Sequence, residues 1–219
     1  MSQTASHTVA AAIEAFGEGE PVLIYDFDDR EGETDIVYPA GAVTPAAVAT
    51  LRNDAGGLIC VALSHEVAES FDLPFLGDVV DHPSTEDPNL GYDSRSSFSL
   101  TVNHRDTYTG VTDNDRSRTI TALAAAATHP DATEFAAEFR APGHVHVLKA
   151  AENLLEERRG QTELGIVLAD AADREPAAVV CEMLDDQTGE ALSKADALAY
   201  AERHGLVFVD GDQLVEQLG

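Results

Sequence analysis

The segment Pro21–Ala40 reads PVLIYDFDDREGETDIVYPA, and it indicates how the chain begins to fold. Two short runs of β-strand character, residues 22–25 and 35–40, enclose the stretch DFDDREGETD, which holds six carboxylates and one arginine in ten residues. A charge run in solvent is usually a loop, but this one is held at both ends by core-forming runs. Carboxylates fixed in this way repel one another unless a cation, a proton or a bound hydroxyl compensates them. The segment therefore predicts two strands with a site-like loop between them.

Further β-like runs follow, and helical patterns alternate with several of them. We expect strands at 57–63, 98–102, 144–148, 177–184 and 206–209. We expect helices near the N-terminus and at 44–53, 115–127, 161–172 and 193–204. Residues 73–93 are rich in Pro, Asp and Gly, and a loop of that length in a compact domain is typically a lid, a binding loop or a disordered segment. We find no repeat and no linker, so one α/β domain over residues 1–219 is the expectation.

The charge of the chain excludes two classes of partner. Forty acidic residues face thirteen basic ones, and the formal net charge is −27. Such a surface repels nucleic acid and anionic membranes, so neither is expected as a partner. Dense carboxylates with only two lysines also suit a halophilic protein, since the Debye length falls to about 3 Å in 1 M salt. The global charge therefore indicates adaptation to high salt. The position of a functional site is indicated instead by the spacing of particular residues along the sequence.

The two cysteines and the hydropathy indicate a cytoplasmic protein. Cys60 and Cys181 lie in the apolar runs GLICVAL and AVVCEML, without a CxxC motif, and we expect both to be buried reduced thiols. No apolar stretch approaches the ~20 residues of a membrane span. The N-terminal segment lacks the basic start of a signal peptide, and it has the pattern of an amphipathic helix.

The acidic loop has the spacing of a cation site. Asp29, Glu31, Glu33 and Asp35 alternate with other residues, so an extended backbone places all four carboxylates on one side. Oxygen donors in such a row suit a hard divalent cation. Arg30 then points elsewhere or turns back to a phosphate. The alternative is a solvated acidic turn, and the spacing alone leaves both readings open.

Four other segments carry candidate chemistry. Residues 97–121 combine a strand that ends near His104 with a helix start that suits an anion. The stretch PGHVH places His144 and His146 at alternate positions of a strand, where they bind metal or move protons, although one of such a pair is often inert. The run 158–163, RRGQTE, indicates an anion site or a salt-bridge cluster. Glu182 interrupts an apolar run and is either a general base or a solvated acid at a strand end.

Taken together, these segments resemble the 3,4-dihydroxy-2-butanone 4-phosphate synthase family. The matching motifs, in order, are DDREGETD, GLICVAL, TVNH with TGVTDNDRSRTI, PGHVHVLKA, RRGQTE and VVCEML, from about Pro21 to Leu184. The resemblance implies a three-layer α+β type of fold with a mixed sheet flanked by helices. It also implies a lyase of riboflavin biosynthesis that converts ribulose 5-phosphate to dihydroxybutanone phosphate and formate with magnesium or manganese. A homodimer with sites near the subunit interface is implied as well.

The resemblance also assigns roles to individual residues. Glu31 matches the metal-binding glutamate of the family, and position 161 matches a second metal ligand. It implies catalytic positions at Asp26, Glu33, Cys60, His144 and Glu182. It implies substrate-binding positions at Arg30, Glu31, Asp35, Arg158, Arg159, Gly160, Gln161, Thr162 and Glu182.

Two positions depart from the family pattern. The family has a histidine where this chain has Gln161, whose carbonyl oxygen suits magnesium and is a poorer ligand for softer ions such as zinc. Asn103 stands where many members carry aspartate. The loss of the histidine leaves a second hypothesis open, a catalytically silent relative that binds a sugar phosphate or a nucleotide. A third hypothesis is another metal-dependent sugar-phosphate enzyme, such as an isomerase or an aldolase.

Overall fold

The computed structural model describes residues 7–86 and 90–219, and its first two strands are those that the acidic segment predicts. Strand β1 (Val22–Tyr25) and strand β2 (Thr34–Pro39) pair in antiparallel fashion. The Asp26 N–H donates to the Glu33 carbonyl and closes the hairpin at the base of the acidic loop. All residues of both strands are buried. The loop therefore begins and ends inside the protein, as the flanking apolar runs require.

The hairpin belongs to a mixed sheet of seven strands in the order β4-β5-β3-β6-β2-β1-β7. The other strands are β3 (Cys60–Leu63), β4 (Phe98–His104), β5 (Phe139–Lys149), β6 (Ala177–Glu182) and β7 (Val207–Asp210). Strands β1 and β7 run parallel, as do β3 and β5, and the remaining pairs are antiparallel. The predicted mixed sheet is thus confirmed.

Helices cover both faces of this sheet. Those of eight or more residues are α1 (Val9–Gly17), α2 (Pro45–Asn53), α5 (Asp113–Thr128), α7 (Gln161–Ala171), α8 (Lys194–His204) and α9 (Gly211–Leu218). Shorter ones are α3 (His65–Ser70), α4 (Leu76–Val79) and α6 (Phe135–Glu138). The Thr44 hydroxyl caps α2 and the Ser193 hydroxyl caps α8, as the sequence predicts. Gly205 ends α8 at a φ of 70°.

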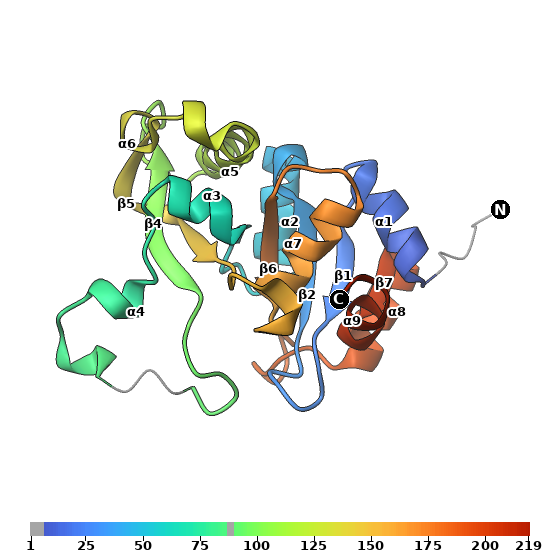
Figure 1. Ribbon diagram of the computed structural model, residues 1–219. Helices are drawn as coiled ribbons and strands as arrows, with labels where there is room; N and C mark the ends of the chain where they lie inside the picture. Colours follow the sequence, from blue (N-terminus) through green and yellow to red (C-terminus); the bar gives the residue numbers. More distant parts are fainter. Residues whose placement is uncertain (1–6, 87–89) are drawn as a thin grey trace.

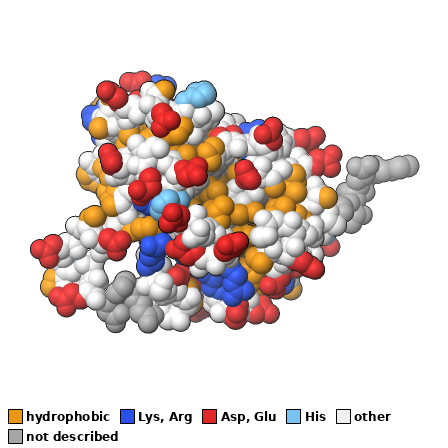
Figure 2. All heavy atoms as spheres, in the orientation of Figure 1, with side chains coloured by type: hydrophobic (Ala, Val, Ile, Leu, Met, Phe, Trp, Pro, Cys, Tyr) orange, Lys and Arg blue, Asp and Glu red, His pale blue; other side chains and the backbone are white. Residues whose placement is uncertain are grey.

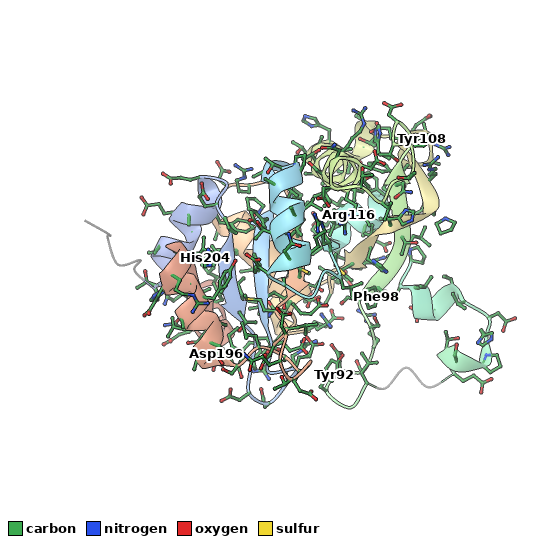
Figure 3. The ribbon with its side chains drawn as sticks, turned by 180° about the vertical axis from the view of Figure 1, so that it is seen from behind. Tyr92, Phe98, Tyr108, Arg116, Asp196 and His204 are labelled. Atoms are coloured by element: carbon green, nitrogen blue, oxygen red, sulfur yellow. The ribbon has the colours of Figure 1, made fainter. Side chains whose placement is uncertain are left out.

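The alternation of side chains along the strands produces two cores. Val22 and Ile24 of β1 pack with α1, α7 and α9 in one core, whereas Leu23 and Tyr25 belong to the core that contains residues of α2, α5 and α8. Figure 1 shows α7 in front of β6, and the reverse view in Figure 3 shows α2 on the other face. Burial on both faces explains why β1 is apolar throughout. The expected three layers are confirmed.

Some boundaries differ from the expectations. Strand β3 begins at Cys60 instead of 57, because the Ile59 N–H turns back to the Gly57 carbonyl. Strands β4 and β5 are longer than expected because they pair along most of their length at the edge of the sheet. The expected loop 73–93 contains α4 and a short turn at Pro83–Thr85. Its residues 87–89, and residues 1–6 of the expected N-terminal segment, lie outside the described residues.

The surface is acidic over much of the face in Figure 2, where basic side chains gather in a few small patches. The acids are thus distributed as the sequence indicates, and not confined to a tail. Among the residues that the structure describes, no helix is both long enough and apolar enough to cross a membrane.

Candidate active site

The register of three neighbouring strands brings key residues of distant segments together. Asp35 of β2 lies opposite Glu182 of β6, and Cys60 of β3 lies opposite Val180 of the same strand. Three positions that are far apart in sequence therefore meet at one end of the central sheet. Because the acidic loop follows β1 at this end, its carboxylates extend the same cluster.

A cleft of about 380 Å³ opens over this cluster. Eight of the residues expected at the site line the cleft: Glu31, Glu33, Asp35, Cys60, Arg158, Gln161, Thr162 and Glu182. The other lining residues are Leu58, Leu90, Tyr92, Ser96, Ser97, Phe98, Leu148, Val180 and Leu184. A larger hollow of about 590 Å³ is lined by none of the expected residues. The cleft with the carboxylates is thus the candidate site.

Asp26 holds the acidic loop in shape. Its carboxylate is almost fully buried and accepts the backbone N–H groups of Glu31 and Glu33, at 3.2 and 2.9 Å. It also accepts a 3.4 Å hydrogen bond from Arg30 Nη1. These contacts fix the backbone of the two glutamates that line the cleft. Asp26 therefore positions the loop from beneath it.

Two arginines converge on one aspartate beside the cleft. Asp93 Oδ2 accepts hydrogen bonds from Arg30 Nη2 at 2.9 Å and from Arg158 Nε at 2.6 Å. Burial would raise the pKa of Asp93, but the two guanidinium groups outweigh burial and lower it. Arg158 Nη1 also donates to Glu163 Oε2 at 2.6 Å. A Cβ atom at position 160 would lie 2.2 Å from Arg158 Nη1, so Gly160 lets this cluster form.

Helix α7 begins at the cleft and presents Gln161 and Thr162 to it. Gln161 Nε2 donates to the Ile24 carbonyl at 3.0 Å and to the Glu33 carbonyl at 3.4 Å. Two carbonyl acceptors require the NH₂ group on their side, so the amide orientation is fixed. Gln161 Oε1 is consequently turned away from them, and it is buried without a hydrogen-bond partner. An unpartnered buried oxygen in a cleft of carboxylates is a ready ligand for a cation.

The carboxylates of the cleft raise one another's pKa. Burial raises the pKa of Asp35 well above its usual value, and the Glu182 and Glu31 charges raise it further. Burial, Glu31 and Glu182 likewise raise the pKa of Glu33. The pKa of Glu182 is also raised, mainly by burial. The cleft therefore concentrates negative charge that a bound cation would stabilise.

The charge cluster also acts on Cys60 and Tyr92. Burial raises the pKa of the Cys60 thiol well above its usual value, and Glu182 and Asp35 add to the rise. Cys60 is therefore a neutral thiol at neutral pH. Burial and the Glu31 charge raise the pKa of Tyr92 to about 12, and the Tyr92 ring lies 5.4 Å from the Arg30 guanidinium carbon. Tyr92 thus covers the acidic loop from the segment that leads into β4 (Figure 3).

Five expected residues do not line the cleft: Asp26, Arg30 and Gly160, which adjoin residues that do, and His144 and Arg159, which lie farther from it. His144 is exposed on β5, beyond the set of residues that lines the cleft, whereas His146 of the same strand pairs with Cys60. Arg159 turns away towards Asp29 and the ring of Phe27. Sequence reasoning missed Asp93 and Tyr92, because nothing in their own segment indicates a site. The only signal in the sequence was the length of the loop 73–93, at whose C-terminal end both residues lie.

The cleft offers a partial set of metal ligands. Among residues 7–86 and 90–219, no three His, Cys, Asp or Glu side chains are gathered closely enough to hold a metal ion by themselves. Glu31 and the unpartnered Oε1 of Gln161 both line the cleft. Oxygen donors, excess negative charge and an incomplete ligand set suit a hard cation that keeps several waters, such as Mg²⁺. The residues present therefore fit a magnesium ion whose coordination is completed by water or substrate.

Comparisons of the sequence and of the structure with known proteins match the same family over nearly the whole chain. The family model of 3,4-dihydroxy-2-butanone 4-phosphate synthase matches residues 10–217. A synthase of that name from Archaeoglobus fulgidus is 50% identical over 217 residues, which cover 94% of this chain and 91% of that protein. One from Methanosarcina mazei is 47% identical over 96% of this chain and 91% of the relative. A crystal structure of such a synthase in complex with two magnesium ions superposes with a TM-score of 0.82 at 30% identity, covering 95% of each chain.

The fold is thus that of a synthase class, one member of which has been crystallised with two magnesium ions. The chain belongs to the 3,4-dihydroxy-2-butanone 4-phosphate synthase family.

Proposed function

We propose that this protein is a lyase of riboflavin biosynthesis that converts ribulose 5-phosphate to 3,4-dihydroxy-2-butanone 4-phosphate and formate. The observation that carries the proposal is the single cleft that holds Glu31, Gln161, Arg158 and Glu182 in a chain of this family. Such a cleft combines oxygen donors for a cation, donors for a phosphate and carboxylates for proton transfer. A cytoplasmic location is part of this proposal, and the two buried free thiols of Cys60 and Cys181 support it.

Glu31 and Gln161 Oε1 are the residues that would hold the divalent cation, Mg²⁺ or Mn²⁺. When bound, the cation stabilises the negative charge that develops on the substrate oxygens after a proton leaves the carbon next to the ketone. The role of the protein is to orient the ligands. Gln161 does so through its two hydrogen bonds to the carbonyls of Ile24 and Glu33, and Glu31 through the backbone that Asp26 holds.

The phosphate of the substrate binds at the start of α7. Arg158 and Thr162 face the cleft there, and the first N–H groups of an eleven-residue helix point towards an anion in that position. Arg30 supports the same anion, since it shares Asp93 with Arg158. Arg159 contributes its charge from outside the cleft. Holding the phosphate fixes the remaining carbons against the carboxylates.

Glu182 and Glu33 move protons, because their raised pKa values bring them closer to neutral pH than an ordinary glutamate. Asp35 raises the pKa of Cys60, and Glu182, which lies opposite Asp35 in the sheet, raises the pKa of Asp35 in turn. Cys60 stays protonated and lines the wall of the cleft. Asp26 holds the acidic loop and thereby positions Glu31 and Glu33.

His144 acts from a second subunit in a homodimer. Its exposed place on β5, outside the cleft of its own chain, leaves it available to a neighbouring chain. Tyr108 and Val111, 93% and 51% exposed, lie on the turn after β4 and provide apolar surface for such contact. The Tyr108 end of β4 is the end opposite Tyr92 (Figure 3). Residues from two subunits then complete each site.

The activity is tested by formate release from ribulose 5-phosphate with magnesium, measured from low salt to 2 M KCl. Glu31→Gln should abolish turnover, whereas Glu18→Gln on the exposed end of α1 should not. Ligand binding without formate would support the silent relative instead. Turnover to another product would support the isomerase or aldolase.

The dimer is tested by complementation. Glu31→Gln and His144→Gln are each expected to be inactive alone. Mixed subunits should regain activity, because one site of each heterodimer then has both an intact Glu31 and an intact His144. A mixture that stays inactive, with heterodimers present, would contradict a shared site.

A further inference from the structure

Asn103 of β4 and His144 of β5 make two hydrogen bonds with each other at the edge of the sheet. The backbone N–H of His144 donates to Asn103 Oδ1 at 2.8 Å, and Asn103 Nδ2 lies 3.2 Å from Nδ1 of the His144 ring. Asn103 is 3% exposed, so its amide is held inside the protein, while His144 is exposed. The buried side-chain amide of Asn103 thus contacts the exposed ring of His144 at the ring nitrogen Nδ1.

The two hydrogen bonds together determine which nitrogen of the ring carries the proton. A backbone N–H can only donate, so the atom of Asn103 that faces it is the carbonyl oxygen. The NH₂ group of Asn103 must then face the ring, and it can only donate as well. Nδ1 of His144 therefore accepts a hydrogen bond and has no proton. In the neutral ring the proton is consequently on Nε2.

The surroundings of Asn103 prevent the amide from moving. A Cβ atom at position 110 would lie 2.1 Å from Asn103 Nδ2, and Gly110 has a φ of 83°. A Cβ atom at position 143 would lie 2.3 Å from the backbone nitrogen of Asn103. Two glycines from different segments thus let the backbone approach Asn103 from both sides. The close packing leaves the amide little room for another orientation.

We infer that Asn103 is a positioning residue that holds His144 in the Nε2–H tautomer, so that the neutral ring presents a hydrogen-bond donor at its exposed nitrogen. An anionic oxygen of a sugar phosphate is the group that such a donor recognises. His144 then donates a hydrogen bond through Nε2, and that protonated nitrogen does not take the first proton from carbon. The catalytic part of this inference rests on the proposed function, but the tautomer does not.

Aspartate at position 103 should have the opposite effect. A carboxylate can only accept hydrogen bonds. One oxygen of the new carboxylate would accept from the backbone N–H of His144, as Asn103 Oδ1 does. The other oxygen would face Nδ1 of the ring, so a hydrogen bond there requires a proton on Nδ1. Asn103→Asp therefore converts the exposed nitrogen from a donor to an acceptor with little change in side-chain volume. Asn103→Asp is thus a specific probe of the tautomer.

The test is ¹⁵N NMR of histidine-labelled protein at a pH where the rings are neutral. The His144 signals are identified by their loss in His144→Gln. In the unmodified protein Nε2 should have the shift of a protonated nitrogen and Nδ1 that of an unprotonated one; Asn103→Asp should exchange them. A proton on Nδ1 in the unmodified protein would overturn the inference, whether or not any variant folds. An unchanged tautomer in a folded Asn103→Asp would also overturn it.

Kinetics provide a second readout in the same proteins. Asn103→Asp should lower kcat by about tenfold or more with little change in KM, because loss of one hydrogen-bond donor to a developing negative charge typically costs about 10²–10³ in kcat. An unchanged kcat in Asn103→Asp, together with a lower melting temperature, would mean that Asn103 acts only on stability and would overturn the catalytic part of the inference. If no formate is released at all, the proposed function fails while the NMR result still decides the tautomer.

Discussion

Asp93 Oδ2 lies 2.6 Å from Arg158 Nε, so the arginine expected to hold the substrate phosphate is already paired with a carboxylate of the protein. The same oxygen also accepts from Arg30. Asp93 lies four residues after position 89, the last position of the loop that is not described. An incoming phosphate must therefore share these donors or replace Asp93 on them.

Asp93→Asn should strengthen the binding of inorganic phosphate, since a neutral amide competes less well for two guanidinium groups. We expect an increase in affinity of roughly three- to tenfold, on the order of 1 kcal/mol. Isothermal titration with inorganic phosphate measures it. Asp29→Asn removes the same charge from an exposed acid that contacts Arg159, and it should have a smaller effect. Weaker phosphate binding in Asp93→Asn would show that Asp93 mainly positions the arginines.

Gln161→His should change the preference among metals. An imidazole nitrogen is a softer ligand than an amide oxygen, so Zn²⁺ and Co²⁺ should bind at least about tenfold more tightly, with less change for Mg²⁺. Metal titration by calorimetry and the visible spectrum of the Co²⁺ protein measure this without reference to turnover. Gln187→His, in the exposed turn after β6, is the matched control. Unchanged affinity for all these ions would place residue 161 outside the coordination sphere.

Asp35→Asn should stabilise the protein above neutral pH. The pKa of Asp35 is raised in the folded state, mainly by burial. The folded protein therefore binds this proton more tightly, and the resulting stability is lost as the pH rises through the raised pKa. Asparagine cannot ionise, so the melting temperature at pH 8 should rise by about 2–4 °C, or roughly 1 kcal/mol. The gain should shrink towards pH 4, and exposed Asp186→Asn should show no such trend.

Added salt should stabilise the folded protein. With a formal net charge of −27, repulsion between carboxylates opposes the compact state, and screening weakens that repulsion. The melting temperature should therefore rise steadily from 0.1 to 2 M KCl. The measurement is a thermal melt followed by circular dichroism without divalent ions. A melting temperature that does not depend on salt would remove the case for a halophilic protein.

The sequence predicted correctly the helices, strands and caps that depend on residues close by in the chain. Strand β1, the cap of α2 at Thr44 and the end of α8 at Gly205 depend on neighbouring residues, and the sequence located all three. The full length of β5 was missed. Residues 140–143 are half-buried or exposed and carry no apolar alternation, and the segment is extended because it pairs with β4. Helix α9 was also missed, although its capping box at Asp210 and Gln213 is visible in the sequence.

The candidate site was predictable to the extent that its residues lie in short motifs. Glu31, Glu33 and Gln161 were found from motifs, and the cleft brings them together. Asp93 was not found, because its partner Arg158 is 65 residues away and its own segment has no periodic pattern. The orientation of the Gln161 amide was also beyond sequence reasoning, since it depends on carbonyls of β1 and of the acidic loop.

The amide of Gln161 joins three parts of the molecule: the first turn of α7, strand β1 through Ile24, and the end of the acidic loop through Glu33. A cation bound to its oxygen would polarise the same amide and strengthen both N–H hydrogen bonds. We therefore expect binding in the cleft to be coupled to the rigidity of the hairpin. Magnesium should slow hydrogen–deuterium exchange of the backbone amides at the base of this hairpin. The exchange rate there would then measure the occupancy of the cleft, although these amides do not contact the ion.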